Sequence, residues 1–140
     1  MEGRQTMKIL IVEDESVSRE KIHFIMQNFG DCTVVEGGKA AVAAFKNAFR
    51  NNSPFHVITL DISMPDMDGK DVLRQIRDAE RAANIPHEKR TKVIMLTAHA
   101  DRNNIQESLR ADCDDYLLKP FNTELVEEKL KNLELLSPQE

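Results

Sequence analysis

The sequence predicts an α/β fold in which helices cover both faces of a parallel β-sheet. Five short apolar runs rich in β-branched residues alternate with stretches whose apolar residues recur at helical spacing. The alternation repeats about every twenty-odd residues, which is typical of strand–helix units in a parallel sheet. The expected strands are residues 7–12, 32–36, 57–60, 92–96 and 115–118, and the expected helices are residues 16–29, 40–49, 70–83, 101–110 and 123–136.

Apolar spacing and chain breakers define the first two units. Residues 7–12 are apolar enough for a strand buried on both faces, and they end at an acidic turn. Four apolar residues then recur at helical spacing, namely Ile22, Ile25, Met26 and Phe29. Gly30 is expected to end this helix. The second helix is rich in Ala and carries Val42, Phe45 and Phe49 on its inward stripe.

The remaining three units follow the same pattern. Residues 57–60 lead into Asp61, and a loop with two strong breakers precedes the next helix. A polar connection, residues 84–91, precedes the fourth strand, which ends at Thr97. Asn122 is expected to cap the final helix. The inward residues expected in these three helices are Val72, Leu73 and Ile76, then Ile105 and Leu109, then Leu125, Val126, Leu130 and Leu133.

Length and composition indicate one compact domain. The chain has 140 residues, of which 41% are hydrophobic and 31% charged, and a chain of this size buries roughly two-thirds of its unfolded surface. The net charge of −5 and the lack of a dense basic run argue against direct binding of nucleic acid. No apolar stretch approaches the roughly 20 residues of a membrane span, and the first six residues lack the apolar centre of a signal peptide. With two distant cysteines, Cys32 and Cys113, we expect a reduced cytoplasmic protein without a disulfide.

Reactive side chains follow four of the five expected strands. Glu13 and Asp14 follow the first strand, Asp61 the third, Thr97 the fourth and Lys119 the fifth. Because ligands of parallel α/β sheets bind outside the carboxyl ends of the strands, these side chains are expected at one site. Three converging carboxylates repel one another unless a cation lies among them, and oxygen-only donors favour Mg²⁺, with Mn²⁺ as a substitute. The pattern indicates an Asp nucleophile that attacks phosphorus, with Lys119 available to the phosphate oxygens.

These residues resemble the receiver domain of two-component response regulators along essentially the whole chain. Four motifs in this order carry the resemblance: Lys8-Ile9-Leu10-Ile11-Val12-Glu13-Asp14, then Asp61-Ile62-Ser63-Met64-Pro65-Asp66-Met67-Asp68-Gly69, then Leu96-Thr97-Ala98, then Asp115-Tyr116-Leu117-Leu118-Lys119-Pro120-Phe121. The resemblance implies a flavodoxin-like (βα)5 three-layer sandwich with strand order 2-1-3-4-5, an order that is itself a standard example of this fold type. It also implies a signalling domain rather than an enzyme.

The resemblance assigns roles to individual residues. It implies that Asp61 accepts a phosphoryl group from a phosphohistidine of a sensor kinase or phosphotransfer protein. Asp14 and Asp61 would bind Mg²⁺ directly, Glu13 mostly through water, and Ser63 through its backbone carbonyl. Lys119 would pair with the phosphoryl oxygens, and its bond to Pro120 is expected to be cis.

Further residues are implicated in switching. Thr97 would move to bind the phosphoryl group, and Tyr116 would turn inward with it, reshaping the last two helices and the strand between them for a protein target. Ser63 and His99 are expected to tune the lifetime of the phosphoryl group. Receivers usually have Gly where this chain has Asp112, so we predict a positive φ at Asp112.

Several features receive other interpretations. Glu15, Asp66 and Asp68 are interpreted as surface residues without a chemical role. The run Gly37-Gly38-Lys39 fails as a phosphate-binding P-loop, because Thr33 stands where a Gly is needed and Ala40 follows the Lys.

The domain is expected to span residues 7–136, with an extension at residues 1–6 and a tail at residues 137–140. Because only this tail follows the final helix, a stand-alone receiver is expected, either a monomer or a dimer that forms on phosphorylation. A receiver excised from a hybrid kinase, cyclase or transcription factor is the alternative. An Mg²⁺-dependent phosphatase of the haloacid-dehalogenase type is disfavoured, because its general acid would stand at Ser63.

Overall fold

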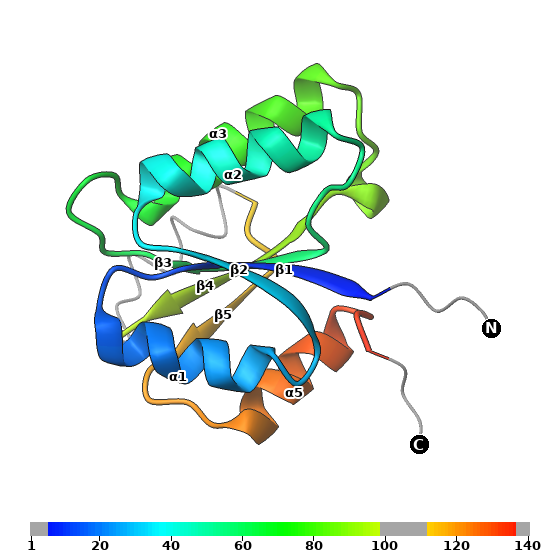
Figure 1. Ribbon diagram of the computed structural model, residues 1–140. Helices are drawn as coiled ribbons and strands as arrows, with labels where there is room; N and C mark the ends of the chain where they lie inside the picture. Colours follow the sequence, from blue (N-terminus) through cyan, green and yellow to red (C-terminus); the bar gives the residue numbers. More distant parts are fainter. Residues whose placement is uncertain (1–5, 99–111, 137–140) are drawn as a thin grey trace.

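The computed structural model describes residues 6–98 and 112–136. In this part of the chain, five parallel strands form one sheet in the order β2-β1-β3-β4-β5, so the expected strand order is confirmed (Figure 1). The strands are β1 (Met7–Val12), β2 (Gly30–Val35), β3 (Val57–Asp61), β4 (Lys92–Thr97) and β5 (Asp115–Leu118). The helices are α1 (Ser16–Met26), α2 (Gly38–Arg50), α3 (Gly69–Ala82) and α5 (Thr123–Asn132), with a short 3₁₀ helix η1 (His87–Lys89). The expected helix at residues 101–110 lies outside the described residues.

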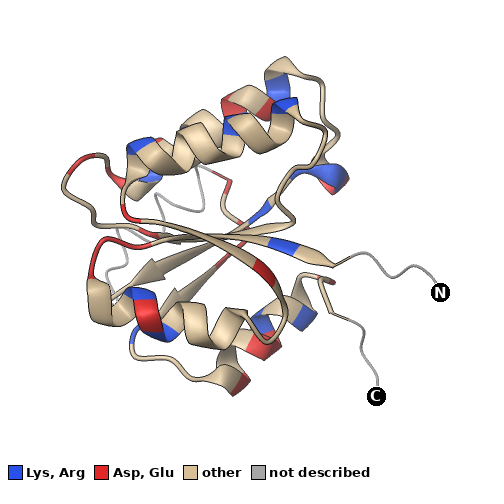
Figure 2. Cartoon of the chain, viewed as in Figure 1, with Lys and Arg blue, Asp and Glu red and all other residues tan. Residues whose placement is uncertain are grey.

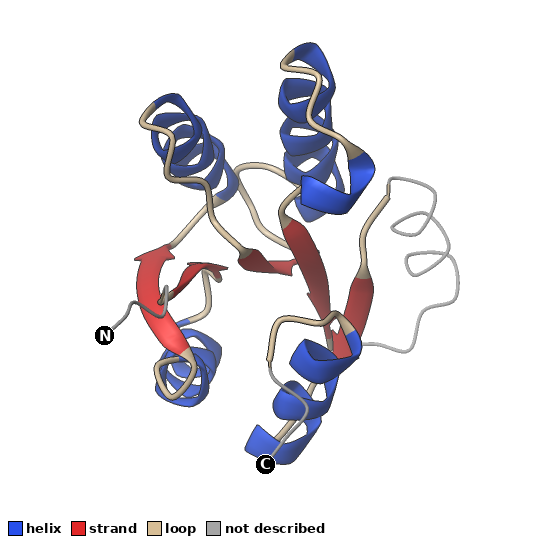
Figure 3. Cartoon of the chain, turned by 90° about the vertical axis from the view of Figure 1, so that its right-hand side faces the viewer, coloured by secondary structure: helices blue, strands red, loops and turns tan. Residues whose placement is uncertain are grey.

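Helices cover the two faces of the sheet, α2 and α3 on one side and α1 and α5 on the other (Figures 1 and 3). Strand β1 shows how the sequence supports this arrangement. Its alternate residues Leu10 and Val12 belong to the core beneath α2 and α3, and Ile9 and Ile11 belong to the core beneath α1 and α5. All four are fully buried, each stabilising the fold by about 1.5–3 kcal/mol. The prediction of a strand buried on both faces is confirmed.

Two element boundaries were predicted wrongly. Helix α1 ends at Met26, and Gly30 is the first residue of β2 rather than a helix stop. A side chain at Gly30 would collide with the backbone carbonyl of Met7 on β1, so this position needs Gly for strand pairing. Helix α5 ends at Asn132 rather than near residue 136, because Glu134 adopts a left-handed φ of 63° and the Leu135 N–H returns to the Leu130 carbonyl.

Side-chain oxygens of two acidic residues and one asparagine cap three helix starts. Glu15 accepts hydrogen bonds from the Val17 and Ser18 N–H groups of α1, and Asp68 accepts one from the Lys70 N–H of α3. These bonds satisfy N–H groups that have no partner within the helix. Asn122 caps α5 through the Leu125 N–H at 2.8 Å, as predicted. Glu15 and Asp68, which were interpreted from the sequence as surface residues without a chemical role, therefore have structural roles as helix caps.

Other local predictions can be compared with the structure. Asp112 has a φ of 74°, which confirms the predicted positive value. On α2, Phe45 is buried, but its buried neighbours are Ala41 and Ala48, and Val42 and Phe49 are only partly buried. Both cysteines are free, at opposite edges of the sheet. None of the helices in the described ranges is long and apolar enough to cross a membrane.

Candidate functional site

Three carboxylates meet where β1 and β3 end, and we call this cluster of Glu13, Asp14 and Asp61 the acidic rim. Each offers one oxygen, and these three oxygens lie within 4.8 Å of one another. Glu13 and Asp61 are buried, with residue exposures of 0% and 6%, whereas Asp14 is closer to solvent. Figure 2 shows acidic segments gathered at this end of the sheet. The structure thus brings together the three carboxylates expected to bind metal.

The backbone around the acidic rim is held from several directions. The Arg19 guanidinium on α1 donates to the carbonyls of Glu13 and Asp14, each at 3.2 Å. Asp61 is the last residue of β3, and its Oδ1 accepts a hydrogen bond from the Ser63 N–H at 3.3 Å. Gly69 packs so closely on the Asp61 carbonyl that any side chain there would collide with it. The carboxylates are therefore presented by rigid backbone rather than by a loose loop.

Lys119 is the cation nearest the acidic rim among the described residues. Its Nζ lies 3.0 Å from Glu13 Oε1 and 3.8 Å from Asp61 Oδ2. The Lys119 N–H donates to the Thr97 carbonyl at 2.8 Å, which aligns the segment after β5 with the end of β4. The Lys119–Pro120 peptide bond is cis, the geometry that the resemblance implies. One lysine opposes three carboxylates, so the cluster keeps an excess of negative charge.

The surroundings of Asp61 raise the pKa of its carboxyl group. Burial, followed by the neighbouring Glu13 carboxyl, raises the pKa of Asp61 from 3.8 to about 7. Lys119 and the Ser63 N–H act in the opposite direction without overcoming these effects. A bound divalent cation would favour the ionised carboxylates that the protein alone disfavours. The donor set of three carboxylates fits Mg²⁺ or Mn²⁺.

The residues expected to act in switching and in phosphoryl lifetime come from β4, β5 and the loop after β3. Thr97 ends β4, next to β3, and is buried. Tyr116 lies on β5 and packs against the core beneath α2 and α3, and the Lys129 ammonium lies 5.4 Å from its ring centroid. Ser63 is exposed in the loop after β3. His99 lies outside the described residues.

Two contributions to the site were not expected from the sequence. The first is Arg19, whose only sequence signal is its position one turn into the helix after the acidic turn. The second is Asp66, whose carboxylate accepts from the Gly38 and Lys39 N–H groups at 3.0 and 3.1 Å. Gly37 makes room for it, since a Cβ there would lie 2.9 Å from Asp66 Oδ2. The run Gly37-Gly38-Lys39 therefore binds an anion. That anion is the Asp66 carboxylate, from the loop that follows Asp61, and not a phosphate.

Comparison with known proteins is consistent with this geometry. The family model described as the response regulator receiver domain matches residues 9–131. The chemotaxis protein CheY of Pseudomonas aeruginosa is 32% identical over 127 residues, covering 91% of this chain and 95% of that protein. The histidine kinase BarA of Escherichia coli is 33% identical over 133 residues, which is 94% of this chain but 13% of the kinase.

Solved structures show the same fold. CheY4 of Vibrio cholerae superposes with a TM-score of 0.76 at 25% identity, covering 92% of this chain and 99% of that one. The receiver domain of the histidine kinase CKI1 of Arabidopsis thaliana, crystallised with Mg²⁺ and BeF₃⁻, superposes with a TM-score of 0.74 at 25% identity. It covers 89% of this chain and 90% of that one.

Proposed function

The chain belongs to the response regulator receiver domain family, and from this premise we propose that Asp61 is its phosphoryl acceptor. The observation that carries the proposal is the acidic rim itself, where Asp61 lies buried beside both Glu13 and Lys119. The domain is a CheY-like signalling domain, so its proposed output is a change in the shape of the surface that it presents to a protein target. The proposed chemistry is limited to its own phosphorylation and dephosphorylation.

The transfer requires one nucleophile and one leaving group. An Asp61 carboxylate oxygen attacks the phosphorus of a phosphohistidine, forming a P–O bond as the P–N bond breaks. The departing imidazole nitrogen keeps the electron pair and takes a proton from water. Lys119, already 3.8 Å from Asp61 Oδ2, pairs with the phosphoryl oxygens, and the Thr97 hydroxyl donates to them.

In the proposed site, Asp14, Asp61 and the backbone carbonyl of Ser63 would hold Mg²⁺ directly and Glu13 mostly through water, with Mn²⁺ as a substitute. Bound metal supplies positive charge to the carboxylates and to the incoming phosphoryl oxygens. Arg19 and Gly69 contribute by fixing the backbone that presents these ligands. Ser63 and His99 are proposed to tune the phosphoryl lifetime, and Thr97 and Tyr116 to report phosphorylation to the surface of β5 and α5.

We propose that a sensor kinase or histidine phosphotransfer protein docks beside the acidic rim, on α1. Val17 and Phe24 on this helix are 70% and 68% exposed. A cavity of about 310 Å³ lies between α1 and the segment after β5, with Val17, Lys119 and Phe121 in its lining. An apolar patch next to the acceptor suits a partner that must bring its phosphohistidine to Asp61. A cytoplasmic location and a monomer, or a dimer that forms on phosphorylation, belong to the same proposal.

The relatives include both a stand-alone receiver and a receiver within a larger protein. This chain matches almost all of a CheY and a small part of a hybrid-type histidine kinase, so it can act alone or as one domain of a larger protein. A phosphatase of the haloacid-dehalogenase type is the weaker alternative, because exposed Ser63 stands where that reaction needs an acid.

Incubation with Mg²⁺ and acetyl phosphate, followed by intact mass measurement, tests the proposal. The wild type should gain one phosphoryl group, and Asp61→Asn should gain none. Asp66→Asn, a matched change at an exposed carboxylate of the same loop, should keep the gain. No modification of the wild type, or a gain retained by Asp61→Asn, would overturn the proposal. Steady hydrolysis of a small phosphate ester that Asp61→Ala abolishes would favour the phosphatase.

A further inference from the structure

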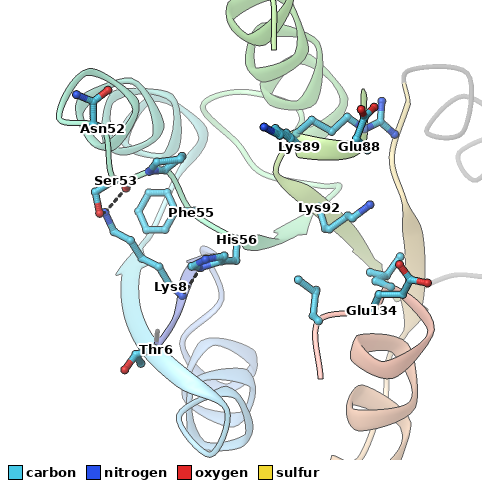
Figure 4. A pocket seen from close by; sticks show the side chains of 14 residues that line it. Thr6, Lys8, Asn52, Ser53, Phe55, His56, Glu88, Lys89, Lys92 and Glu134 are labelled. Atoms are coloured by element: carbon cyan, nitrogen blue, oxygen red, sulfur yellow. Dashed lines mark hydrogen bonds between the residues drawn. The ribbon is translucent and has the colours of Figure 1, made fainter. Parts of the chain in front are cut away.

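A cavity of about 430 Å³ lies at the amino ends of the strands, the end of the sheet opposite the acidic rim (Figure 4). Segments from β1, the α2–β3 connection, η1, β4 and the residues after α5 line it. We call it the basic cavity, because four of its lining residues are cationic and two are anionic: Lys8, Lys89, Arg90 and Lys92 against Glu88 and Glu134. A net positive lining is unusual for a chain whose net charge is −5.

Two of these cations have ammonium groups without a partner among the described residues. Arg90 is engaged by Asp114 at 3.0 Å and Asp112 at 3.4 Å. The side-chain ammonium groups of Lys89 and Lys92, in contrast, make no hydrogen bond or ion pair with any residue in the ranges 6–98 and 112–136, although both residues line the cavity. A bound anion would give these two ammonium groups a partner of opposite charge.

The scaffold of the basic cavity is fixed by hydrogen bonds along the strand starts. The His56 N–H donates to the Lys8 carbonyl at 2.8 Å, and the Lys92 N–H donates to the His56 carbonyl at 3.0 Å. Lys8 Nζ is held by the carbonyl and hydroxyl of Ser53. Lys8, His56 and Lys92 therefore lie side by side at the starts of β1, β3 and β4, with His56 between the two lysines (Figure 4).

The tautomer of His56 is fixed as well. Its Nδ1 accepts a hydrogen bond from the Lys8 N–H at 2.8 Å, so the ring hydrogen is on Nε2 and Nε2 is a donor. His56 lines the cavity, and this donor has no acceptor among the described residues. Together with the ammonium groups of Lys89 and Lys92, it gives three donors on residues that line the cavity, from the segment before β3, from η1 and from β4.

We propose that the basic cavity binds a small organic phosphate. A phosphate group accepts hydrogen bonds from several donors at once, as this arrangement offers. The volume of about 430 Å³ exceeds the needs of a bare phosphate and falls in the range of small-molecule sites. Phe55, Leu133 and Leu135 in the lining provide apolar contact for the organic part, while Glu88 and Glu134 disfavour ligands made only of negative charge.

The test is an NMR titration of the metal-free protein with AMP and, separately, with pyrophosphate. Both probes should shift the amide signals of Lys8, His56 and Lys92 saturably, with AMP the tighter because it uses the apolar wall. Lys92→Gln should weaken AMP binding about tenfold, as should Lys89→Gln on the surface, where folding is not at issue. Lys46→Gln, which removes the same charge from the exposed face of α2, should leave the affinity unchanged.

The site does not depend on the role of Asp61, so Asp61→Asn should bind AMP as the wild type does. No saturable shift up to about 10 mM of either probe would overturn the proposal. Equal weakening by Lys46→Gln and Lys92→Gln would also overturn it, because binding would then follow net charge alone. Amide shifts confined to the acidic rim would also overturn the proposal, because the probes would then bind outside the basic cavity.

Discussion

Two clusters of buried charged residues lie at opposite ends of the sheet. At the carboxyl ends of the strands, Lys119 lies between Glu13 and Asp61. Where β4 and β5 begin, Arg77 is buried with Glu80 and Asp114. In the second cluster, Arg77 bonds Glu80 and Asp114, each at 2.8 Å, and the Thr91 carbonyl at 2.7 Å. Arg90 supplies a second positive charge to Asp114. This cluster balances its own charges, and the acidic rim does not.

The difference explains why one cluster is structural and the other is a candidate binding site. In the balanced cluster, the Thr91 N–H also donates to Glu80 and the Val93 N–H to Asp114, each at 2.8 Å, so both buried carboxylates are satisfied within the protein. The acidic rim has three carboxylates and one ammonium, and it needs a positive partner from outside. A buried charge without its partner thus marks where this molecule meets a ligand.

The largest effect is expected from breaking the balanced cluster. Arg77→Met removes the cation paired with buried Glu80 and one of the two cations paired with Asp114, which should lower the free energy of unfolding by about 3–5 kcal/mol. Urea denaturation measures the change. Arg81→Met is the control on the same helix, because Arg81 pairs with Asp78 in solvent, each side chain 62% exposed, and should change stability by less than about 1 kcal/mol. Equal effects of the two substitutions would contradict the comparison.

A smaller effect of opposite sign is expected at the acidic rim. The pKa of Asp61 is about 7 in the folded protein and 3.8 ordinarily. Between these values the folded state holds a proton that the unfolded state has lost, so stability falls as the pH rises towards 7 and levels off above it. In EDTA at pH 8, Asp61→Asn should therefore unfold with a free energy higher by on the order of 2 kcal/mol.

Thermal unfolding from pH 5 to 8 in EDTA checks this expectation. Addition of Mg²⁺ should raise the Tm of the wild type and leave that of Asp61→Asn nearly unchanged, because binding to the folded state alone stabilises it. Wild-type stability that rises between pH 5 and 7 without metal would show that the acidic rim is not under charge repulsion.

The smallest effect is expected for an exposed anion at a helix start. The N–H groups of Gly38 and Lys39 lower the pKa of Asp66, so its contribution to stability is present above 3.8 and is lost as the pH falls below it. Asp66→Ala should lower the Tm at pH 7 by a few degrees. Scanning calorimetry should find a smaller difference at pH 3, and a difference that grows on acidification would refute the role.

The sequence predicted the site from a general rule about parallel sheets, whereas the strand order came from the resemblance to receiver domains. Apolar runs mark the strands, and parallel strands place Glu13, Asp61 and Lys119 at one edge. The charged residues of α3 were missed, although Leu73, Arg77 and Glu80 recur at helical spacing. An arginine on an inward stripe signals a buried partner, but nothing in the chain indicates that the partner is Asp114.

The basic cavity was missed for a related reason. The rule that locates ligands considers the carboxyl ends of strands, and Lys8, His56 and Lys92 lie at the amino ends. These residues are brought together by the same strand register that aligns the carboxyl ends of the sheet.

The end of α5 also depends on the left-handed turn at Glu134, which residue type alone does not specify.

The most direct test of the central claim identifies the atom that receives the phosphoryl group. The protein is treated with Mg²⁺ and acetyl phosphate and then with borohydride, which reduces an acyl phosphate to an alcohol, and its peptides are analysed by mass spectrometry. The account predicts homoserine at position 61 and an unchanged side chain at Asp14, Asp66 and Asp68. Homoserine at any of those positions, or none anywhere, would contradict it.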